Sequence, residues 1–222
     1  MSVGSLLVAV FNDKDPAMTT PSMSAPETRV AYPDELSLRQ ARAAYFARTG
    51  FDDTTYVEPW VKLPAGPFTV VMPNLAPRKA AVKIHDLNHI LTGYGTDWQG
   101  EFEISAFEIG MGTGRYWFGW FLDVGGLAAG LLRFREPTLR AFARGRRTQR
   151  SVYREVPDFT DAVLDQTVGA LRERVRIPDD AVPTAADQRA ALGWGLVGMA
   201  LHIGLPLLGL AAIVAAIVVA VA

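Results

Sequence analysis

The sequence contains no cysteine, only three histidines and almost no net charge. The absence of cysteine excludes disulfides, thiolate metal ligands and cysteine catalysis, and it leaves the cellular compartment undetermined. A formal net charge of −1 provides no overall field that would attract nucleic acid, so we expect no nucleic-acid partner. With 222 residues, the chain is long enough for one helical domain with a core and additional segments.

Two of the three histidines lie four residues apart in a stretch that also carries acidic residues. His85 and His89 enclose Asp86, and Glu101 follows after eleven intervening residues, which gives the pattern H-D-x-x-H-x11-E. Positions i and i+4 lie on one face of a helix, so both imidazoles can point toward one spot. Apolar residues at helical spacing predict such a helix from about Arg78 to Thr92, before the break at Gly93-Tyr94-Gly95.

The segment Thr96-Asp97-Trp98-Gln99 has the pattern of a capping box with Thr96 as the N-cap. A second helix is therefore predicted from Asp97 to about Ile109, with Gly110 at its end. A short turn between two helices predicts an antiparallel hairpin, in which Glu101 faces the histidines. Glu108 follows seven residues later and lies on nearly the same face.

Two neutral imidazoles with one or two carboxylates form a mixed nitrogen and oxygen site for a divalent metal. Zinc is favoured, with iron and manganese as the other candidates. We predict His85, His89, Asp86 and Glu101 as ligands, although Asp86 could instead orient an imidazole. Asp86 and Glu108 are also the predicted catalytic residues, with Glu108 as a proton carrier. The alternative is an amphipathic helix with two polar histidines and solvated acids.

These residues resemble the signature of a ubiquinone (coenzyme Q) biosynthesis family, the fourth-numbered protein of the coenzyme Q series. The similarity is specific around the motif and loose elsewhere, and it spans roughly Ala31 to Pro178. The residues that carry it are His85, Asp86, His89 and Glu101, with Leu91-Thr92-Gly93-Tyr94-Gly95, Gly100-Glu101 and Leu171-Arg172-Glu173 before Ile177.

The resemblance implies a role in ubiquinone biosynthesis, with a polyprenylated quinone precursor as ligand and other ubiquinone-biosynthesis proteins as partners. The favoured role is a metal-dependent lyase that removes the ring carboxylate of a polyprenyl-benzoate and hydroxylates that carbon. The alternative role is a non-catalytic organiser of the biosynthetic complex that binds the lipid intermediate. The sequence has no flavin or nicotinamide fingerprint, so the oxidant would be dioxygen or another external oxidant. The sequence does not decide whether the chain forms a homodimer.

Two hydrolase classes with related histidine motifs do not fit. An H-E-x-x-H peptidase needs glutamate where this chain has Asp86. An HD-type phosphohydrolase uses a further upstream histidine, and none precedes His85.

The sequence predicts an all-α fold, with a single helical domain over residues 31–178 built around the metal-binding hairpin. A mobile tail over residues 1–30 precedes it. A helix is predicted from Asp34 to Thr49. The stretch from Phe51 to Pro73 contains four prolines, which predict short helical turns and loop, with Trp60, Phe68 and Val70 in the core.

Three further segments complete the predicted domain. Trp117 to Leu132 is apolar apart from Asp123, which predicts a buried helix beside the hairpin with most of its residues packed in the core. The family resemblance favours the alternative that part of this apolar wall lines a cavity for a lipid tail. Arg133 to Arg154 carries eight arginines, which indicate a solvated basic face or a surface for anionic lipid headgroups. An amphipathic helix is predicted from Asp161 to Arg174.

The C-terminal part has no formally charged residue from Leu192 to Ala222. A membrane-spanning helix needs about 20 apolar residues, which Ile203 to Ala222 supplies. We predict a linker over residues 179–191 and a membrane anchor over 192–222, with Leu192 to Leu201 as an interfacial lead-in. A buried core or dimerisation helix is the alternative. The predicted location is a membrane with the domain on its cytoplasmic face, either the bacterial inner membrane or the matrix face of a mitochondrial membrane.

Overall fold

The computed structural model describes residues 29–65, 68–157 and 159–221. The fold over these residues is helical, with a single two-stranded hairpin and one long apolar helix at the C-terminus, which confirms the predicted fold class. The predicted N-terminal tail lies outside the described residues up to position 28.

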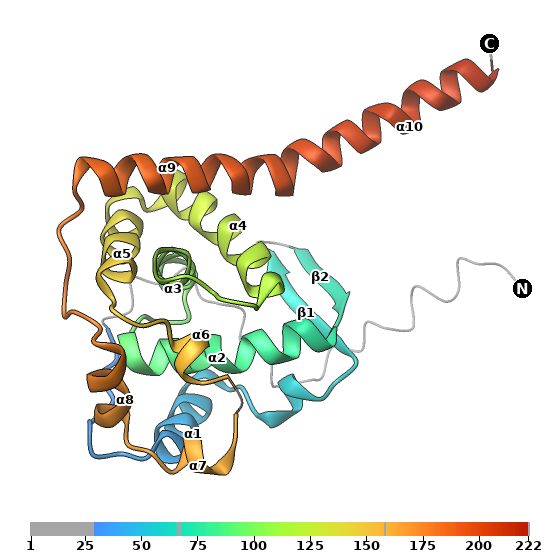
Figure 1. Ribbon diagram of the computed structural model, residues 1–222. Helices are drawn as coiled ribbons and strands as arrows, with labels where there is room; N and C mark the ends of the chain where they lie inside the picture. Colours follow the sequence, from blue (N-terminus) through green and yellow to red (C-terminus); the bar gives the residue numbers. More distant parts are fainter. Residues whose placement is uncertain (1–28, 66–67, 158, 222) are drawn as a thin grey trace, which may run out of the picture.

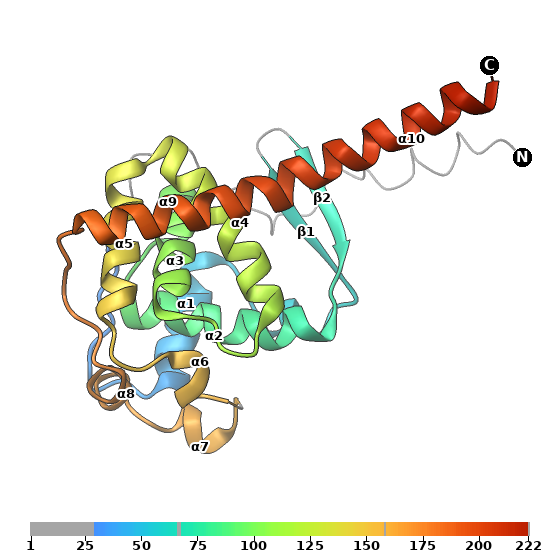
Figure 2. The same cartoon turned by 45° about the horizontal axis from the view of Figure 1, so that its top comes forward.

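The helices pack around a central one, α3, which is flanked by α2, α4 and α5, while α9 lies across the outer side of α4 (Figure 1). The last helix, α10, extends beyond the body of the domain in both views (Figures 1 and 2). In chain order the elements are α1 (Leu38–Thr49), the 3-10 turn η2 (Asp53–Tyr56), β1 (Trp60–Ala65), β2 (Phe68–Pro73), α2 (Ala76–Thr92), α3 (Trp98–Met111), α4 (Trp117–Arg133), α5 (Arg135–Arg147), α6 (Val152–Glu155), α7 (Asp161–Leu164), α8 (Val168–Val175), α9 (Ala185–Met199), the π-helical segment η3 (Ala200–Gly204) and α10 (Leu205–Val221).

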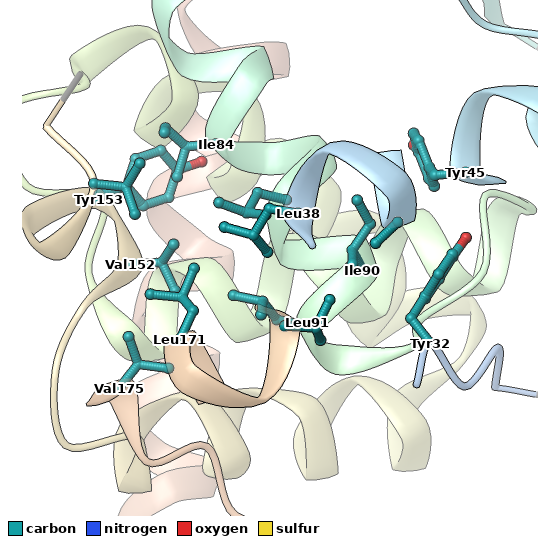
Figure 3. Close-up of a cluster of buried hydrophobic side chains, with 14 of the residues drawn as sticks. Tyr32, Leu38, Tyr45, Ile84, Ile90, Leu91, Val152, Tyr153, Leu171 and Val175 are labelled. Carbon is teal, nitrogen blue, oxygen red and sulfur yellow. The ribbon is translucent and has the colours of Figure 1, made fainter. Parts of the chain in front are cut away.

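Two apolar cores hold the domain together. The first lies between α1, α2, α6 and α8, and its largest side chains interdigitate in Figure 3. The second lies between α3, α4 and α5. Because α2 is anchored in the first core and α3 in the second, their junction is fixed from both sides. The first core includes Leu38, Tyr45, Ile84, Ile90, Leu91, Val152 and Leu171, and the second includes Ile104, Phe107, Val124, Leu127 and Phe142.

The end of α2 is held by arginines from distant parts of the chain. Arg172 of α8 donates hydrogen bonds to the backbone carbonyls of Leu91 and Ile90, both at 3.0 Å. Arg144 of α5 donates to the carbonyl of Thr92 at 3.1 Å. These carbonyls have no partner within the helix, and they carry the negative end of its dipole, so the two guanidinium groups stabilise the helix end.

The predicted α1 helix begins later than expected, at Leu38 rather than Asp34. Ser37 is its N-cap, in a capping box with Gln40. Ser37 also pairs with Thr167 in an isolated antiparallel bridge, and the residues before it, from Pro33 to Leu36, form a turn instead of helix. The predicted end is confirmed, because Gly50 caps the helix in the left-handed conformation with a φ of 74°.

The short helical turns and loop predicted between Phe51 and Pro73 are confirmed in the first part, where η2 forms. The second part instead forms β1 and β2, paired antiparallel from Trp60 opposite Pro73 to Ala65 opposite Phe68. A two-stranded ribbon tolerates proline because each strand has one edge that needs no backbone donor. The prediction that Trp60 belongs to the core is also wrong, because its side chain is 58% exposed. The side chains of Phe68 and Val70 lie outside the described part of the chain.

Two predicted boundaries near the C-terminus are also wrong. The single helix predicted from Asp161 to Arg174 is split into α7 and α8, because Thr167 caps the N-terminus of α8 by accepting from the amide of Ala170. Helix α9 begins at Ala185, inside the predicted linker, where Thr184 and Asp187 form a capping box.

The closest helix contact in the second core needs two glycines. A Cβ atom at Gly145 of α5 would overlap the carbonyl oxygen of Phe107, and a Cβ atom at Gly110 of α3 would overlap that of Phe142. The predicted helix end at Gly110 is therefore wrong: this glycine lies inside α3, which runs to Met111. Its role is close packing rather than termination.

We expect Gly145→Ala to destabilise the domain by about 1–3 kcal/mol, because the added methyl group forces α3 and α5 apart. Thermal unfolding in mild detergent measures this. Gly193→Ala is the matched control, since nothing lies within 4 Å of a Cβ atom at this helical position. It should be neutral or stabilising by up to about 1 kcal/mol. Equal melting temperatures for the two variants would contradict the close contact between α3 and α5.

Candidate metal centre

The predicted histidine helix and acidic helix meet at a short connection. Gly93 ends α2 in the left-handed conformation with a φ of 77°, as predicted. The N-cap of α3 is Asp97 rather than the predicted Thr96, because the Asp97 side chain accepts from the amide of Gly100 at 2.7 Å. The two helices do not lie antiparallel: α3 is seen end-on where α2 runs across the view (Figure 1). Glu101 still reaches the histidines because it lies in the first turn of α3.

The two imidazole rings each direct their Nε2 atom toward the same point. The Nδ1 atom of His85 lies 3.2 Å from Oε2 of Glu108, and the Nδ1 atom of His89 lies 3.0 Å from the carbonyl oxygen of Tyr94. A carbonyl or an ionised carboxylate can only accept, so each Nδ1 carries the proton that it donates. Each Nε2 of the neutral rings therefore holds a lone pair, and these two atoms are 3.1 Å apart.

Glu101 completes a group of three donor atoms. Its Oε2 lies 3.5 Å from Nε2 of His85, and its Oε1 lies 3.7 Å from Nε2 of His89. Ligands about 2.0–2.1 Å from a tetrahedral ion are about 3.3 Å apart, close to these separations. His85, His89 and Glu101 could therefore hold a metal ion, as the sequence predicts. The side chains of Glu101 and His85 are 36% and 21% exposed, so the group is open on their side.

Glu108 lies behind His85 and is completely buried. Besides the hydrogen bond from His85, it accepts one from the side-chain amide of Asn88 at 2.6 Å and one from the hydroxyl of Tyr153 at 2.9 Å. A carboxylate on the far nitrogen of a ligating histidine fixes the orientation of the ring and raises its basicity. The structure thus brings Glu108 to the site, but on the side of His85 that faces away from Glu101.

The charges of this cluster oppose one another. Burial lowers the pKa of His85, but the nearby carboxylates of Glu108 and Glu101 outweigh it, and the net pKa is well above the usual value. For His89 burial dominates, and its pKa is lowered. Burial raises the pKa of Glu101, but the hydrogen bond from His85 and the charge of His89 lower it by a larger amount. The net pKa is below its usual value, so this carboxylate stays ionised.

Asp123 of α4 adds a second acidic group next to Glu108. His85, Glu108 and Asp123 form another group of close donor atoms that shares His85 with the first. Burial and the charge of Glu108 raise the pKa of Asp123 well above its usual range. Its Oδ2 has no hydrogen-bond partner while both carboxyls are ionised, and a proton on Asp123 gives it Glu108 as an acceptor.

Asp86, predicted both as a ligand and as a catalytic residue, belongs to neither group of donor atoms among the described residues. It lies next to His85 along the helix and therefore points in another direction. Its carboxylate accepts hydrogen bonds from the hydroxyls of Tyr45 and Tyr56. Burial raises the pKa of Asp86 to about 6. The ring of Tyr45 stacks on the ring of His89, with centroids 5.8 Å apart, so Asp86 is linked to the site through this tyrosine.

The sequence interpretation missed several residues around the histidines. Asn88 and Tyr153 hold Glu108, and Tyr45 covers His89. Asn88 has a detectable signal, since it is a polar residue that lies between the two motif histidines on the same helix. Asp123 also has one, as the single acidic residue of an apolar helix. The two tyrosines come from distant segments and carry no local signal.

No protein-family model, curated protein or solved structure matches this chain. The interpretation of the site therefore depends on its geometry and on the motif.

We expect Glu108→Gln to reduce the affinity for a divalent metal by about 10- to 100-fold, because an amide orients and polarises His85 less well than a carboxylate. Titration with zinc, followed by elemental analysis, measures the change. Glu103→Gln is the control: it is the same substitution on the same helix, outside both groups of donor atoms. If both variants bind zinc like the original chain, Glu108 has no role in orienting His85.

We expect Asp86→Asn to keep the metal content of the original chain, since an asparagine can accept from one of the two tyrosine hydroxyls and donate its NH2 to the oxygen of the other. Elemental analysis after dialysis measures this, with His89→Ala as the variant that should lose the metal. A loss in Asp86→Asn as large as in His89→Ala would restore Asp86 as a ligand.

Proposed function

We propose that this chain is a metal-dependent enzyme of ubiquinone biosynthesis. Its reaction would remove the carboxylate from the ring of a polyprenylated benzoate and place a hydroxyl on the same carbon. The observation that carries the proposal is the convergence of the two Nε2 atoms, 3.1 Å apart, beside a partly exposed Glu101. The family resemblance of the motif supplies the substrate class.

The donor set fits a divalent metal ion, with zinc favoured and iron or manganese as the other candidates. His85, His89 and Glu101 would hold it, which leaves a coordination position on the exposed side. When bound there, such an ion polarises an oxygen of the substrate or lowers the pKa of a water molecule.

The chain's own residues have separate tasks in this proposal. Glu108 holds the proton on Nδ1 of His85 and so keeps Nε2 available. Tyr45 stacks on His89 and excludes water from its buried side. Helix α4 contributes Asp123 next to Glu108. Its apolar residues Val124 and Leu127 are buried in the second core, so the isoprenoid tail would lie on exposed residues such as Trp117 and Leu122.

The overall conversion needs an oxidant. An acid ArCOOH becomes ArOH and CO2 only if two electrons leave the substrate. We propose dioxygen as the acceptor, because the sequence has no fingerprint for a flavin or a nicotinamide. With water as the source of the hydroxyl oxygen, dioxygen would be reduced to hydrogen peroxide.

One observation favours the alternative role, a non-catalytic organiser that binds the lipid intermediate. Within the two described groups of donor atoms, Glu101 is the exposed carboxylate and a proposed ligand, whereas Glu108 and Asp123 are buried. Neither buried acid lies on the open side, so the predicted proton transfer by Glu108 would require a path through His85. An organiser needs no such path.

The membrane is part of the proposal. The helix from Ala185 to Val218 is long and apolar enough to cross a membrane. We propose that it anchors the domain on the cytoplasmic face, which suits a substrate with a polyprenyl tail. Of the arginines predicted to contact lipid headgroups, Arg146 and Arg147 instead pair with Asp187 within the domain, at 2.9 and 3.1 Å.

We expect His85→Ala and His89→Ala to lose both the bound metal and the conversion of a polyprenyl-hydroxybenzoate head group, measured by mass spectrometry of the extracted lipid. His202→Ala is the control, since this third histidine lies outside the groups of donor atoms. If the two variants lose metal but conversion continues wherever lipid is bound, the enzyme proposal is wrong and the organiser role remains. If the original chain binds no divalent metal, both the ligand assignment and the proposed chemistry are wrong.

A further inference from the structure

Helix α9 presents an apolar surface on its outward side. We call this surface the outer face of α9; it consists of exposed residues at helical spacing in α9 and in the adjoining segment η3. A helix on a water-exposed surface normally carries polar residues there, and exposed apolar patches mark contacts with partners or membranes. The residues of the outer face are Leu192, Leu196, Val197, Met199 and Ile203.

The opposite face of α9 is fixed to the domain. A Cβ atom at Gly198 would overlap the carbonyl oxygen of Val124, so the α9 and α4 backbones are in close contact. The ring of Trp194 in α9 packs edge-on against the ring of Trp120 in α4, with centroids 5.9 Å apart. Helix α9 is therefore a rigid part of the domain rather than a free linker, and its outer face is a surface of the domain.

The uncharged C-terminal helix is longer than the hydrocarbon core of a bilayer is thick. From Ala190 to Val221 the chain has no formally charged residue, and at 1.5 Å per residue this helix would measure about 48 Å. The hydrocarbon core of a bilayer is about 30 Å thick. A straight crossing would therefore leave about 18 Å, or about twelve uncharged residues, outside the hydrocarbon. Those residues are the docked part of the helix, which carries the outer face.

A π-helical segment separates the docked part from α10. Within it, the ring of His202 stacks on Phe121 of α4, with centroids 4.5 Å apart, and Gly125 leaves space for that ring. Single π-helical turns are sites where helices bend. The helix is held by the domain up to this point, and α10 leaves the domain beyond it (Figures 1 and 2).

We propose that the chain bends further at η3 when α10 enters a bilayer, so that the outer face of α9 lies in the interfacial layer of that bilayer and the domain is held against the membrane surface. This inference rests on the proposed membrane insertion of α10. Continuity favours lipid over a second copy of the chain, because the outer face runs into α10 without an intervening charge. Its area also disfavours a second copy: fifteen helical residues offer about 22 Å by 10 Å, well below the about 800 Å² per partner of a stable interface.

The proposal has a consequence for the site. Helix α4 contacts α9 through Val124, and the adjacent Asp123 lies beside Glu108 of the candidate metal centre. The centre is thus one helix layer away from the proposed lipid contact. Because Asp123 and Glu108 lie on the closed side of the centre, the ring of a substrate with a membrane-embedded tail would still have to reach the open side beside Glu101.

Single-cysteine labelling tests the proposal cleanly, because the chain has no cysteine of its own. The full chain is reconstituted into phosphatidylcholine and phosphatidylglycerol vesicles with a nitroxide at one position. Leu196→Cys probes the outer face, and Val182→Cys is the matched control, since both native side chains are 72% exposed. Ile213→Cys, in the middle of α10, reports on the anchor itself. Collision with oxygen, which concentrates in lipid, is compared with collision with a nickel chelate, which stays in water.

We expect the oxygen-to-nickel collision ratio at Leu196→Cys to be several-fold above that at Val182→Cys and below that at Ile213→Cys. If Ile213→Cys is in lipid while Leu196→Cys resembles Val182→Cys, the inference is wrong but the anchor stands. If all three positions are in water, the proposed membrane insertion is wrong as well. If Leu196→Cys is shielded from both reagents and shows spin–spin broadening, a second copy covers the outer face, and the inference is also wrong.

Discussion

The arrangement of the candidate metal centre depends on two hydrogen bonds that do not touch its open side. Glu108 and the carbonyl of Tyr94 each accept the Nδ1 proton of one histidine. With those protons fixed, two lone pairs face each other at 3.1 Å. Two acceptors at this distance repel unless a proton or a metal ion lies between them. The carboxylates of Glu108 and Glu101 raise the pKa of His85, which favours a proton at this position when no metal is bound, and the same negative charge would favour a metal ion in its place.

The packing of the domain keeps the histidines and the carboxylates of the site together. The histidines belong to a helix anchored in one core, while Glu101 and Glu108 belong to a helix anchored in the other. Neither helix can rotate away without disturbing its own core. Tyr153 and Asn88 fix Glu108 in turn, so that each ligand-bearing side chain is supported by residues behind it. Such support is what keeps a site ready for its ion.

The sequence predicted the parts of this site that depend on local spacing. The histidines share a face because they are four residues apart, and Gly93 ends the helix because it can adopt a positive φ. Asp86 was assigned by the same pattern, but its partners are tyrosines from α1 and η2, which no local rule could supply. The strands around Trp60 were missed for a related reason. Their prolines predicted a loop, but a two-stranded ribbon at the edge of the domain tolerates proline. Pairing between distant segments decides such features, and a single sequence does not reveal it.

The contact between Arg172 and the end of α2 has a consequence for the order of events during synthesis. This arginine lies more than eighty residues after the motif histidines, yet it holds the carbonyls of Ile90 and Leu91 directly behind His89. A ribosome-bound chain that has released the histidines but not α8 has a helix with an open, fraying end. If the site holds a metal ion, its histidine helix has a supported end only after almost the whole domain has emerged.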